Sequence, residues 1–154
     1  MNKSKQNGSS LIEVMIALFV LAIGMLGVLA MQTSSIKLSR TSTSYSQASI
    51  LATDIIEAMR STPNNLNAYA ITFNATAPNL PNCTNKGTIC DSAQIAQWNL
   101  ASWRRNVVEL LPSGDSQIEV DGDKATVSVR FRSGFDEVNQ QPIDETVVMT
   151  AVFR

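Results

Sequence analysis

Apolar residues are concentrated near the start of the chain, where Val14 to Met31 form 18 consecutive residues without a charge. A helix of that length rises about 27 Å, at about 1.5 Å per residue, which is close to the hydrocarbon thickness of a bilayer. The run is longer than the core of a secretory signal, and it continues into polar Gln32 and Thr33 rather than ending at a clear cleavage site. The pattern predicts a membrane-spanning helix that the mature protein keeps.

The same helix is predicted to continue to about Arg60, because no proline and no cluster of turn residues interrupts the chain after Ser10. Beyond Gln32 it is rich in serine and threonine, and its apolar residues can form a stripe that packs on a folded head. We expect Ser61-Thr62-Pro63 to end it. The predicted stripe consists of Ile36, Ile50, Leu51, Ile55 and Met59.

A loop region and a second helix are predicted next. Residues 61–90 are rich in Asn, Pro and Thr and lack a sustained period, which favours a loop. Asp91 is a good N-cap for a helix over about 92–111. We interpret Trp98 and Trp103 as core residues rather than as a platform for a ligand, and the neighbouring Arg104 and Arg105 as part of a solvated face.

Three strands complete the pattern. Residues 117–120 and 125–131 alternate between polar and apolar side chains on either side of Asp121-Gly122-Asp123, which predicts a hairpin. Residues 146–153 supply a third strand. The expected fold is therefore α+β, with a long N-terminal helix packed on a small antiparallel sheet and a second helix.

Charge and residue types restrict the functions that remain. The chain has no histidine, and the residues from 61 onward carry seven basic and ten acidic side chains, a net charge of −3. This balance gives no electrostatic reason to expect nucleic-acid binding. No set of residues suggests catalysis, a metal or a cofactor, and the acidic turn at 121–123 is interpreted as a solvated hairpin tip rather than a calcium site.

The two cysteines, Cys83 and Cys90, are separated by six residues and follow the apolar run, which predicts one disulfide in an oxidising compartment. Lys3 and Lys5 precede the run, and the positive-inside bias then places the N-terminus in the cytoplasm and the head outside it. Both signals agree on the side of the membrane.

Glu13 is the unusual residue, because a carboxylate at the border of an apolar helix is costly to desolvate and is a functional candidate by default. The alternative interpretation is a tolerated interfacial residue, helped by the positive end of the helix dipole. From the residue alone, both interpretations stay open.

The string Gly8-Ser9-Ser10-Leu11-Ile12-Glu13 followed by the charge-free run resembles the prepilin processing motif of type IV pilins and of type II secretion pseudopilins. The resemblance implies that a prepilin peptidase cuts after Gly8 and methylates the new amine of Ser9, where the family usually has Phe or Met. It also implies that Glu13 pairs with the N-terminal amine of a neighbouring subunit. The implied parts are a leader at 1–8, a membrane and filament helix at 9–31, its amphipathic continuation at 32–60 and a periplasmic head at 61–154.

The Ala-Ile-Gly-Met-Leu-Gly stretch at 22–27, together with the second helix, Leu-Pro-Ser-Gly and the hairpin, further resembles PilV-type minor pilins. This implies a non-enzymatic minor pilin that helps to initiate, cap or modify a pilus. The implied partners are other minor pilins, the major pilin, the inner membrane and the assembly platform. A pseudopilin of a type II secretion system is the nearest alternative. A pilus-displayed binding module for DNA or a surface is a second one.

Overall fold

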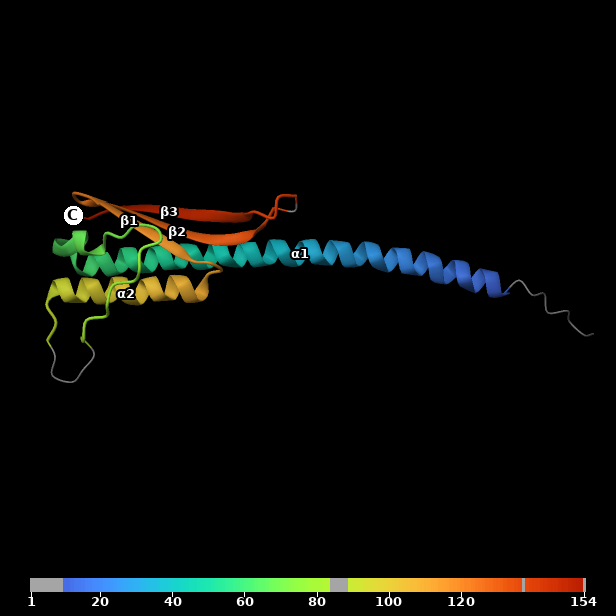
Figure 1. Cartoon of the computed structure of the whole chain (residues 1–154), viewed down its shortest axis with the longest axis horizontal. Coiled ribbons are helices and arrows are strands. Elements are labelled where there is room, and N and C mark those ends of the chain that lie inside the picture. The colour runs from blue at the N-terminus through green and yellow to red at the C-terminus, as the bar shows by residue number, and fades with distance from the viewer. Residues whose placement is uncertain (1–9, 84–88, 137, 154) are drawn as a thin grey trace, which may run out of the picture. The chain divides into compact units, whose positions relative to one another are not determined.

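The computed structural model describes residues 10–83, 89–136 and 138–153 (Figure 1). It divides into two units, with the boundary between Ser39 and Arg40. The predicted leader at 1–8 and the predicted methylation site at Ser9 lie outside the described residues. The elements are α1 (Ser10–Ser61), the 3₁₀ helix η1 (Pro63–Tyr69), α2 (Ser92–Leu110), β1 (Asp115–Asp121), β2 (Lys124–Phe135) and β3 (Pro142–Val152). This order confirms the α+β, pilin-like fold.

The first unit consists, among its described residues, of α1 up to Ser39. The large apolar side chains from Leu11 to Met31 are all more than half exposed. Within the described part of the chain, α1 is the single helix that is long and apolar enough to cross a membrane. A helix that is apolar on every side, and that no other described segment covers, is suited to an apolar environment supplied from outside the chain.

In the second unit, α1 buries one stripe of side chains against the head, with spacings of three and four residues. The stripe includes Leu51, Ile55 and Met59, as predicted, and it also includes Ala48 and Ala52. The predicted stripe was wrong at two positions, because Ile36 and Ile50 are 55% and 60% exposed. Ile50 precedes buried Leu51 by one residue, which rotates it about 100° around the helix, and Ile36 lies before the second unit begins.

The segment after α1 is more ordered than the predicted loop. Pro63 occupies the start of η1, where its missing N–H costs no hydrogen bond. The buried hydroxyls of Thr62 and Tyr69 lie 2.8 Å apart and bond to each other, which joins the two ends of this turn. Ile71 then pairs with Ile118 of β1 through two backbone hydrogen bonds of 3.1 and 2.8 Å. The segment therefore extends the sheet edge by one bridge.

The predicted second helix is confirmed, and it ends one residue earlier than expected. Asp91 accepts from the backbone N–H of Gln94, and Gln94 accepts from the N–H of Asp91, which is a complete capping box. Trp103 is buried, and its Nε1 donates to the carbonyl of Leu51 at 2.7 Å. This bond joins α2 to the second half of α1, and Figure 1 shows the two helices side by side there.

The sheet has the order β1-β2-β3 with both pairs antiparallel. Asp121 pairs with Lys124, so Gly122 and Asp123 form a two-residue turn, and Gly122 has a φ of +57°. Such a φ suits glycine in the tight turns that join antiparallel strands. Both predicted hairpin strands and the third strand are present, and all three are longer than predicted.

Contacts at two positions along α1 show the direction in which β2 and β3 run beside it. Near the start of the second unit, Tyr45 stacks edge-on against Phe131 with ring centroids 5.0 Å apart and donates to Glu145 at 2.7 Å. Near the end of α1, the guanidinium of Arg60 lies 5.8 Å from the ring of Phe153. The strand β3 therefore runs parallel to α1, and β2 runs back in the opposite direction.

Gly114 gives a test of the packing between α2 and β1. A methyl group at Gly114 would lie 2.0 Å from the carbonyl oxygen of Val107, which is backbone and cannot turn away. We expect Gly114→Ala to lower the free energy of unfolding by about 2–3 kcal/mol, through overpacking. The measurement is urea unfolding of the full chain in detergent micelles, followed by tryptophan fluorescence.

Gly134→Ala is the matched control, because a methyl group there meets nothing within 4 Å. It should change the free energy of unfolding by no more than about 0.5 kcal/mol. Equal unfolding midpoints for the two variants would contradict the packing described here.

Candidate functional site

Glu13 lies in the first turn of α1, at the start of the apolar run. Its neighbours Leu11, Ile12 and Val14 are 74%, 65% and 56% exposed, so the carboxylate lies among apolar side chains that the described part of the chain leaves largely uncovered. The other two predicted processing residues, Gly8 and Ser9, lie outside the described residues. Glu13 follows Ser9 by four positions in the sequence, a spacing of about one helical turn.

Cys83 and Cys90 form a disulfide, with their Cα atoms 5.6 Å apart. The bond closes a short segment just before Asp91, the N-cap of α2. It therefore restrains the chain between η1 and α2. Among the described residues, no group of three or more His, Cys, Asp or Glu side chains is placed to hold a metal ion.

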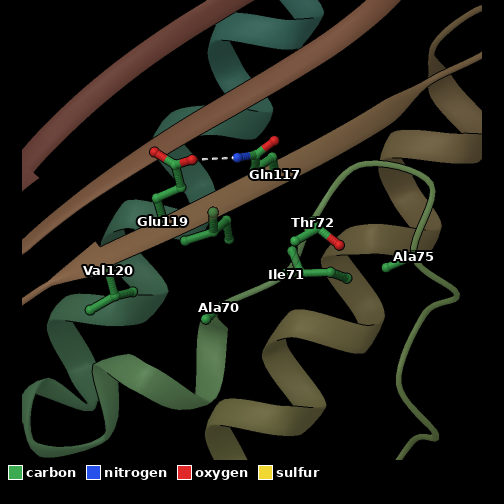
Figure 2. Close-up of a pocket in the computed structure, with 8 residues that line it drawn as sticks. Ala70, Ile71, Thr72, Ala75, Gln117, Glu119 and Val120 are labelled. Carbon is green, nitrogen blue, oxygen red and sulfur yellow. Dashed lines mark hydrogen bonds between the residues drawn. The ribbon is translucent and has the colours of Figure 1, made fainter.

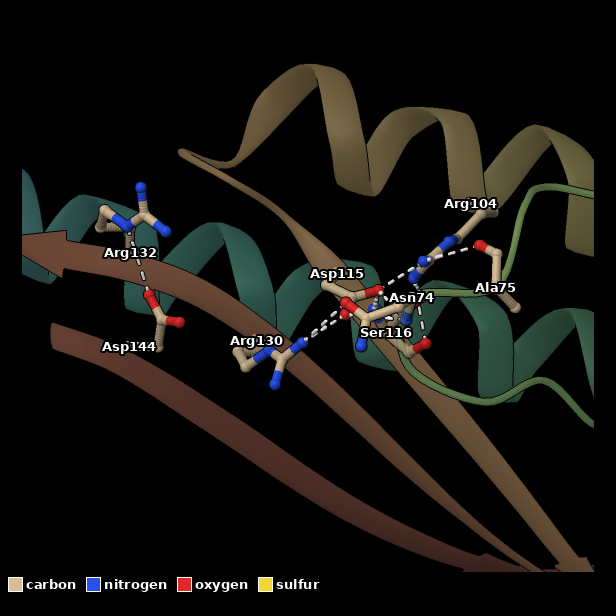
Figure 3. A network of polar contacts seen from close by, with 8 residues as sticks. All are labelled: Asn74, Ala75, Arg104, Asp115, Ser116, Arg130, Arg132 and Asp144. Atoms are coloured by element: carbon tan, nitrogen blue, oxygen red, sulfur yellow. Dashed lines mark hydrogen bonds and ion pairs between the residues drawn. The ribbon is translucent and has the colours of Figure 1, made fainter. Parts of the chain in front are cut away.

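A buried ionic network joins α2 to the hairpin (Figure 3). Asp115, the first residue of β1, binds Arg104 of α2 through Oδ1, and its Oδ2 lies 2.5 Å from Nη2 of Arg130 on β2. The backbone N–H of Asn74 and that of Ser116 also donate to the same carboxylate, at 3.1 and 2.8 Å. One carboxylate thus connects α2, both hairpin strands and the segment before α2.

Arg104 is only 5% exposed, and both terminal nitrogens of its guanidinium donate hydrogen bonds. Nη1 donates to the carbonyl and the hydroxyl of Ser116 at 3.0 and 2.7 Å, and Nη2 donates to the carbonyl of Ala75 at 3.1 Å. Hydrogen bonds of this kind are required for a buried guanidinium, because an unpaired buried charge is strongly destabilising. Among the described residues, every buried side-chain nitrogen and oxygen has a partner.

The solvated face predicted for the two adjacent arginines was wrong at Arg104 and correct at Arg105, which is exposed. The helical period contained the signal: Arg104 lies four residues after buried Leu100 and three before buried Val107. The prediction gave more weight to the charge of Arg104 than to its position on the helix. Its partner Asp115 could not be found from the sequence, since it belongs to a different element eleven residues away.

Burial by itself raises the pKa of Asp115, but the hydrogen bond from Arg104 and those from the N–H groups of Asn74 and Ser116 outweigh it. The pKa of this carboxyl therefore lies below its ordinary value of 3.8. Asp115 is an anion at neutral pH. With two arginines around one aspartate, the network retains a net charge of +1.

The network opens into a polar recess between α2, the segment at 74–75 and the sheet, which we call the arginine recess and define as Arg104, Asp115, Arg130, Arg132 and Asp144. Arg132 on β2 pairs with Asp144 on β3 at 3.4 Å. Arg130 also lies over the ring of Phe73, 4.4 Å from its centroid. The side chains of Arg130 and Arg132 are 32% and 33% exposed, so both reach solvent.

A second hollow lies along the edge of β1 that faces away from β2 (Figure 2). Its walls are mostly small or apolar, from residues 70–75 and from β1, and its polar side chains Gln117 and Glu119 bond to each other at 2.5 Å. The hollow marks the place where the segment around Ile71 covers the edge of the sheet.

Comparisons with protein families find two matches. Residues 30–101 match a family described as type IV pilin Tt1218, and residues 3–29 match the prokaryotic N-terminal methylation motif. No curated protein and no solved structure matches the chain. The two matches follow each other along the chain and end within α2, so the strands lie outside both.

Proposed function

We propose that this chain, which carries a type IV pilin segment behind a prokaryotic N-terminal methylation motif, is a minor pilin that helps to initiate, cap or modify a type IV pilus. The observation that carries the proposal is that the methylation motif, residues 3–29, contains most of the charge-free run of α1, in a chain that also folds into an α+β unit. The matched pilin family is structural rather than enzymatic.

In this proposal a prepilin peptidase removes residues 1–8 by cutting after Gly8 and then methylates the amine of Ser9. The new ammonium and the carboxylate of Glu13 both lie at the edge of an apolar helix, where an unpaired charge is costly. Pairing the ammonium of one subunit with Glu13 of a neighbour neutralises both charges at once. The apolar side chains of α1 then bury one another in the filament core.

The proposed location is the inner membrane before assembly and the pilus afterwards. Lys3 and Lys5 favour a cytoplasmic N-terminus, which places the head in the periplasm. The disulfide between Cys83 and Cys90 supports that side, because disulfides persist in oxidising compartments. The proposed partners are other minor pilins, the major pilin, the prepilin peptidase and the assembly platform, and no nucleic acid.

The resemblance to PilV-type minor pilins supports a minor rather than a major subunit, and the match to a type IV pilin family favours a pilus over a type II secretion system. A deletion strain separates the two systems. We expect it to lose or alter piliation and to keep its secreted proteins, whereas lost secretion with normal pili would contradict the pilus assignment.

Processing is the direct test of the proposed function. Mass spectrometry of the exported chain should find an N-terminus at Ser9 that carries one methyl group. Gly8→Ala should leave a longer, membrane-held form on a size gel, because the peptidase recognises the glycine before the cleaved bond. Asn7→Ala, one residue earlier, is the control and should be processed normally. Processing of Gly8→Ala at the native rate, or an intact Met1 on the exported chain, would contradict the proposal.

A further inference from the structure

The two edges of the sheet differ in how they are covered. At the β1 edge, Ile71 pairs with Ile118 through two backbone hydrogen bonds of 3.1 and 2.8 Å. The strand β3 forms the other edge, and among the residues that the structure describes no segment pairs with its outer side. An open edge presents N–H and C=O groups that can bond to another strand. The β3 edge is therefore a candidate contact surface.

The hydrogen-bond pattern identifies the backbone groups of β3 that point away from the sheet. The N–H of Phe153 donates to the carbonyl of Asp123 at 2.7 Å, so these two residues form a hydrogen-bonded pair. Bonded and non-bonded pairs alternate in an antiparallel ladder, so the odd-numbered residues from 145 to 151 bond to β2. The even-numbered residues direct their backbone groups outward. From position 146 onward these are Thr146, Val148, Thr150 and Val152.

The usual protections of an edge strand are absent between residues 146 and 152. Natural edge strands commonly carry lysine or proline, contain a bulge or are very short. Residues 146–152 contain no charge, no proline and no glycine. Two of their outer side chains, Val148 and Val152, are 58% and 54% exposed. An edge of this kind is prone to aggregation when nothing covers it, which indicates a specific partner.

One stripe of α1 lies beside the inner face of β3 and stays partly exposed. It consists of Tyr45, which donates to Glu145, then Ser49, and then Thr53, whose Oγ1 lies 3.8 Å from Sδ of Met149. The hydroxyls of Ser49 and Thr53 each donate to the carbonyl four residues earlier in α1, both at 2.9 Å. An apolar side chain can therefore cover them without leaving a hydroxyl unpaired.

We propose that the β3 edge binds an extended strand of a different pilin chain, which is added to the three-stranded sheet as a fourth strand. The inference rests on the proposed function, because a minor pilin has other pilin chains as its neighbours. The strand β3 runs parallel to α1. Antiparallel pairing of two β3 strands from copies of this chain would set their α1 helices in opposite directions, whereas pilins held by one membrane share one direction.

The side chains around the edge define the sequence that fits the added strand. Its inward residues are apolar, because they lie beside Val147 and Met149, which are only partly buried and pack against the core. Its end beside Asp144 and Glu145 carries no acidic residue, since like charges directly opposite each other in a sheet are destabilising. The partner therefore supplies a strand that alternates between apolar and polar residues and has few charges.

Site-specific photo-cross-linking of the full chain in the cells that produce it tests this contact. One row of residues crosses the outer face of the sheet, from Glu119 on β1 through Thr126 on β2 to Thr150 on β3. Thr150→p-benzoylphenylalanine places the probe at the open edge. Irradiation should join it to an alternating strand of another pilin. Glu119→p-benzoylphenylalanine, in the same row at the covered edge, is the matched control and should not form that adduct.

A proline at the edge separates backbone pairing from side-chain contact. Val148→Pro removes an N–H that points away from β2, so it leaves the β2–β3 hydrogen bonds in place while it blocks an added strand. The adduct yield from position 150 should fall at least about tenfold. Val148→Ala shortens the side chain and keeps the N–H, so its yield should stay close to the native one. Urea unfolding shows whether each variant is folded.

Adducts are scored on chains whose N-terminus is cut after Gly8 and methylated, so that failure of the contact is distinguished from failure of the pilin assignment. On such chains, no protein adduct from position 150 would overturn the contact, and an adduct to a second copy of this chain would overturn the choice of partner. An undiminished yield from folded Val148→Pro would overturn the backbone pairing. If Val148→Pro does not fold, the site of the adduct decides, because it must lie in an alternating strand of the partner.

Discussion

Asp115→Ala should lower the free energy of unfolding of the head by about 3–5 kcal/mol, because it leaves the buried Arg104 without its carboxylate. The side chain of Arg104 is 6% exposed and cannot turn into solvent without leaving Ser116 and Ala75. A domain of this size has only about 5–15 kcal/mol of stability, so much of it depends on one carboxylate. The measurement is again urea unfolding of the full chain in micelles, followed by the fluorescence of buried Trp103.

Asp144→Asn is the matched control, since it removes an aspartate from the more exposed pair with Arg132. Pairs that are about a third exposed are screened by water, and the expected change is within about 1 kcal/mol. If Asp144→Asn were as destabilising as Asp115→Ala, the network around Arg104 would not be the main ionic contribution to the head.

The same network predicts how stability changes with pH. The pKa of Asp115 is lower in the folded chain than its ordinary value of 3.8, so the folded state holds the proton less tightly than the unfolded state. The stabilisation is therefore fully present above the ordinary pKa and is lost as the pH falls below about 4 toward the lowered pKa. Asp115→Asn should remove this part of the acid dependence.

The parts of the fold that sequence could predict are those that depend on neighbours in the chain. The N-cap at Asp91, the turn at Gly122 and the end of α1 before Pro63 each follow from a few adjacent residues. Their physical causes are local hydrogen bonds and backbone angles, which the residue types reveal directly. Once these local features were identified, the order of the helices and strands along the chain could be predicted as well.

The parts that sequence missed depend on distant partners. Ile50 and Leu51 were both predicted to face the head. Because neighbouring residues point about 100° apart around α1, only Leu51 is buried. Arg104 is charged, but Ser116, Ala75 and Asp115 together make its burial tolerable. In both cases the prediction used the residue type, whereas the structure was decided by the position on the helix and by groups from other elements.

Glu13→Ala should abolish incorporation into filaments while leaving membrane insertion and leader cleavage intact. In the proposed assembly, Glu13 pairs with the N-terminal ammonium of a neighbouring subunit. The variant therefore leaves that ammonium unpaired in the apolar core. Removing one partner of a buried pair costs about 3–5 kcal/mol, and every 1.4 kcal/mol is a tenfold change in an equilibrium. The expected loss of incorporation is therefore at least about a hundredfold, measured as the ratio of the chain in sheared pili to the chain in the membrane.

Two further variants separate charge from shape at this position. Glu13→Gln keeps the size of the side chain and removes its charge, so it should fail nearly as completely as Glu13→Ala. Val14→Ala changes the next residue of the same exposed turn without touching a charge and should assemble at close to the native level. If Glu13→Gln assembled as well as Val14→Ala, then a hydrogen-bonding group would be enough at this position. The ion pair would no longer explain why a carboxylate stands at the edge of an otherwise charge-free helix.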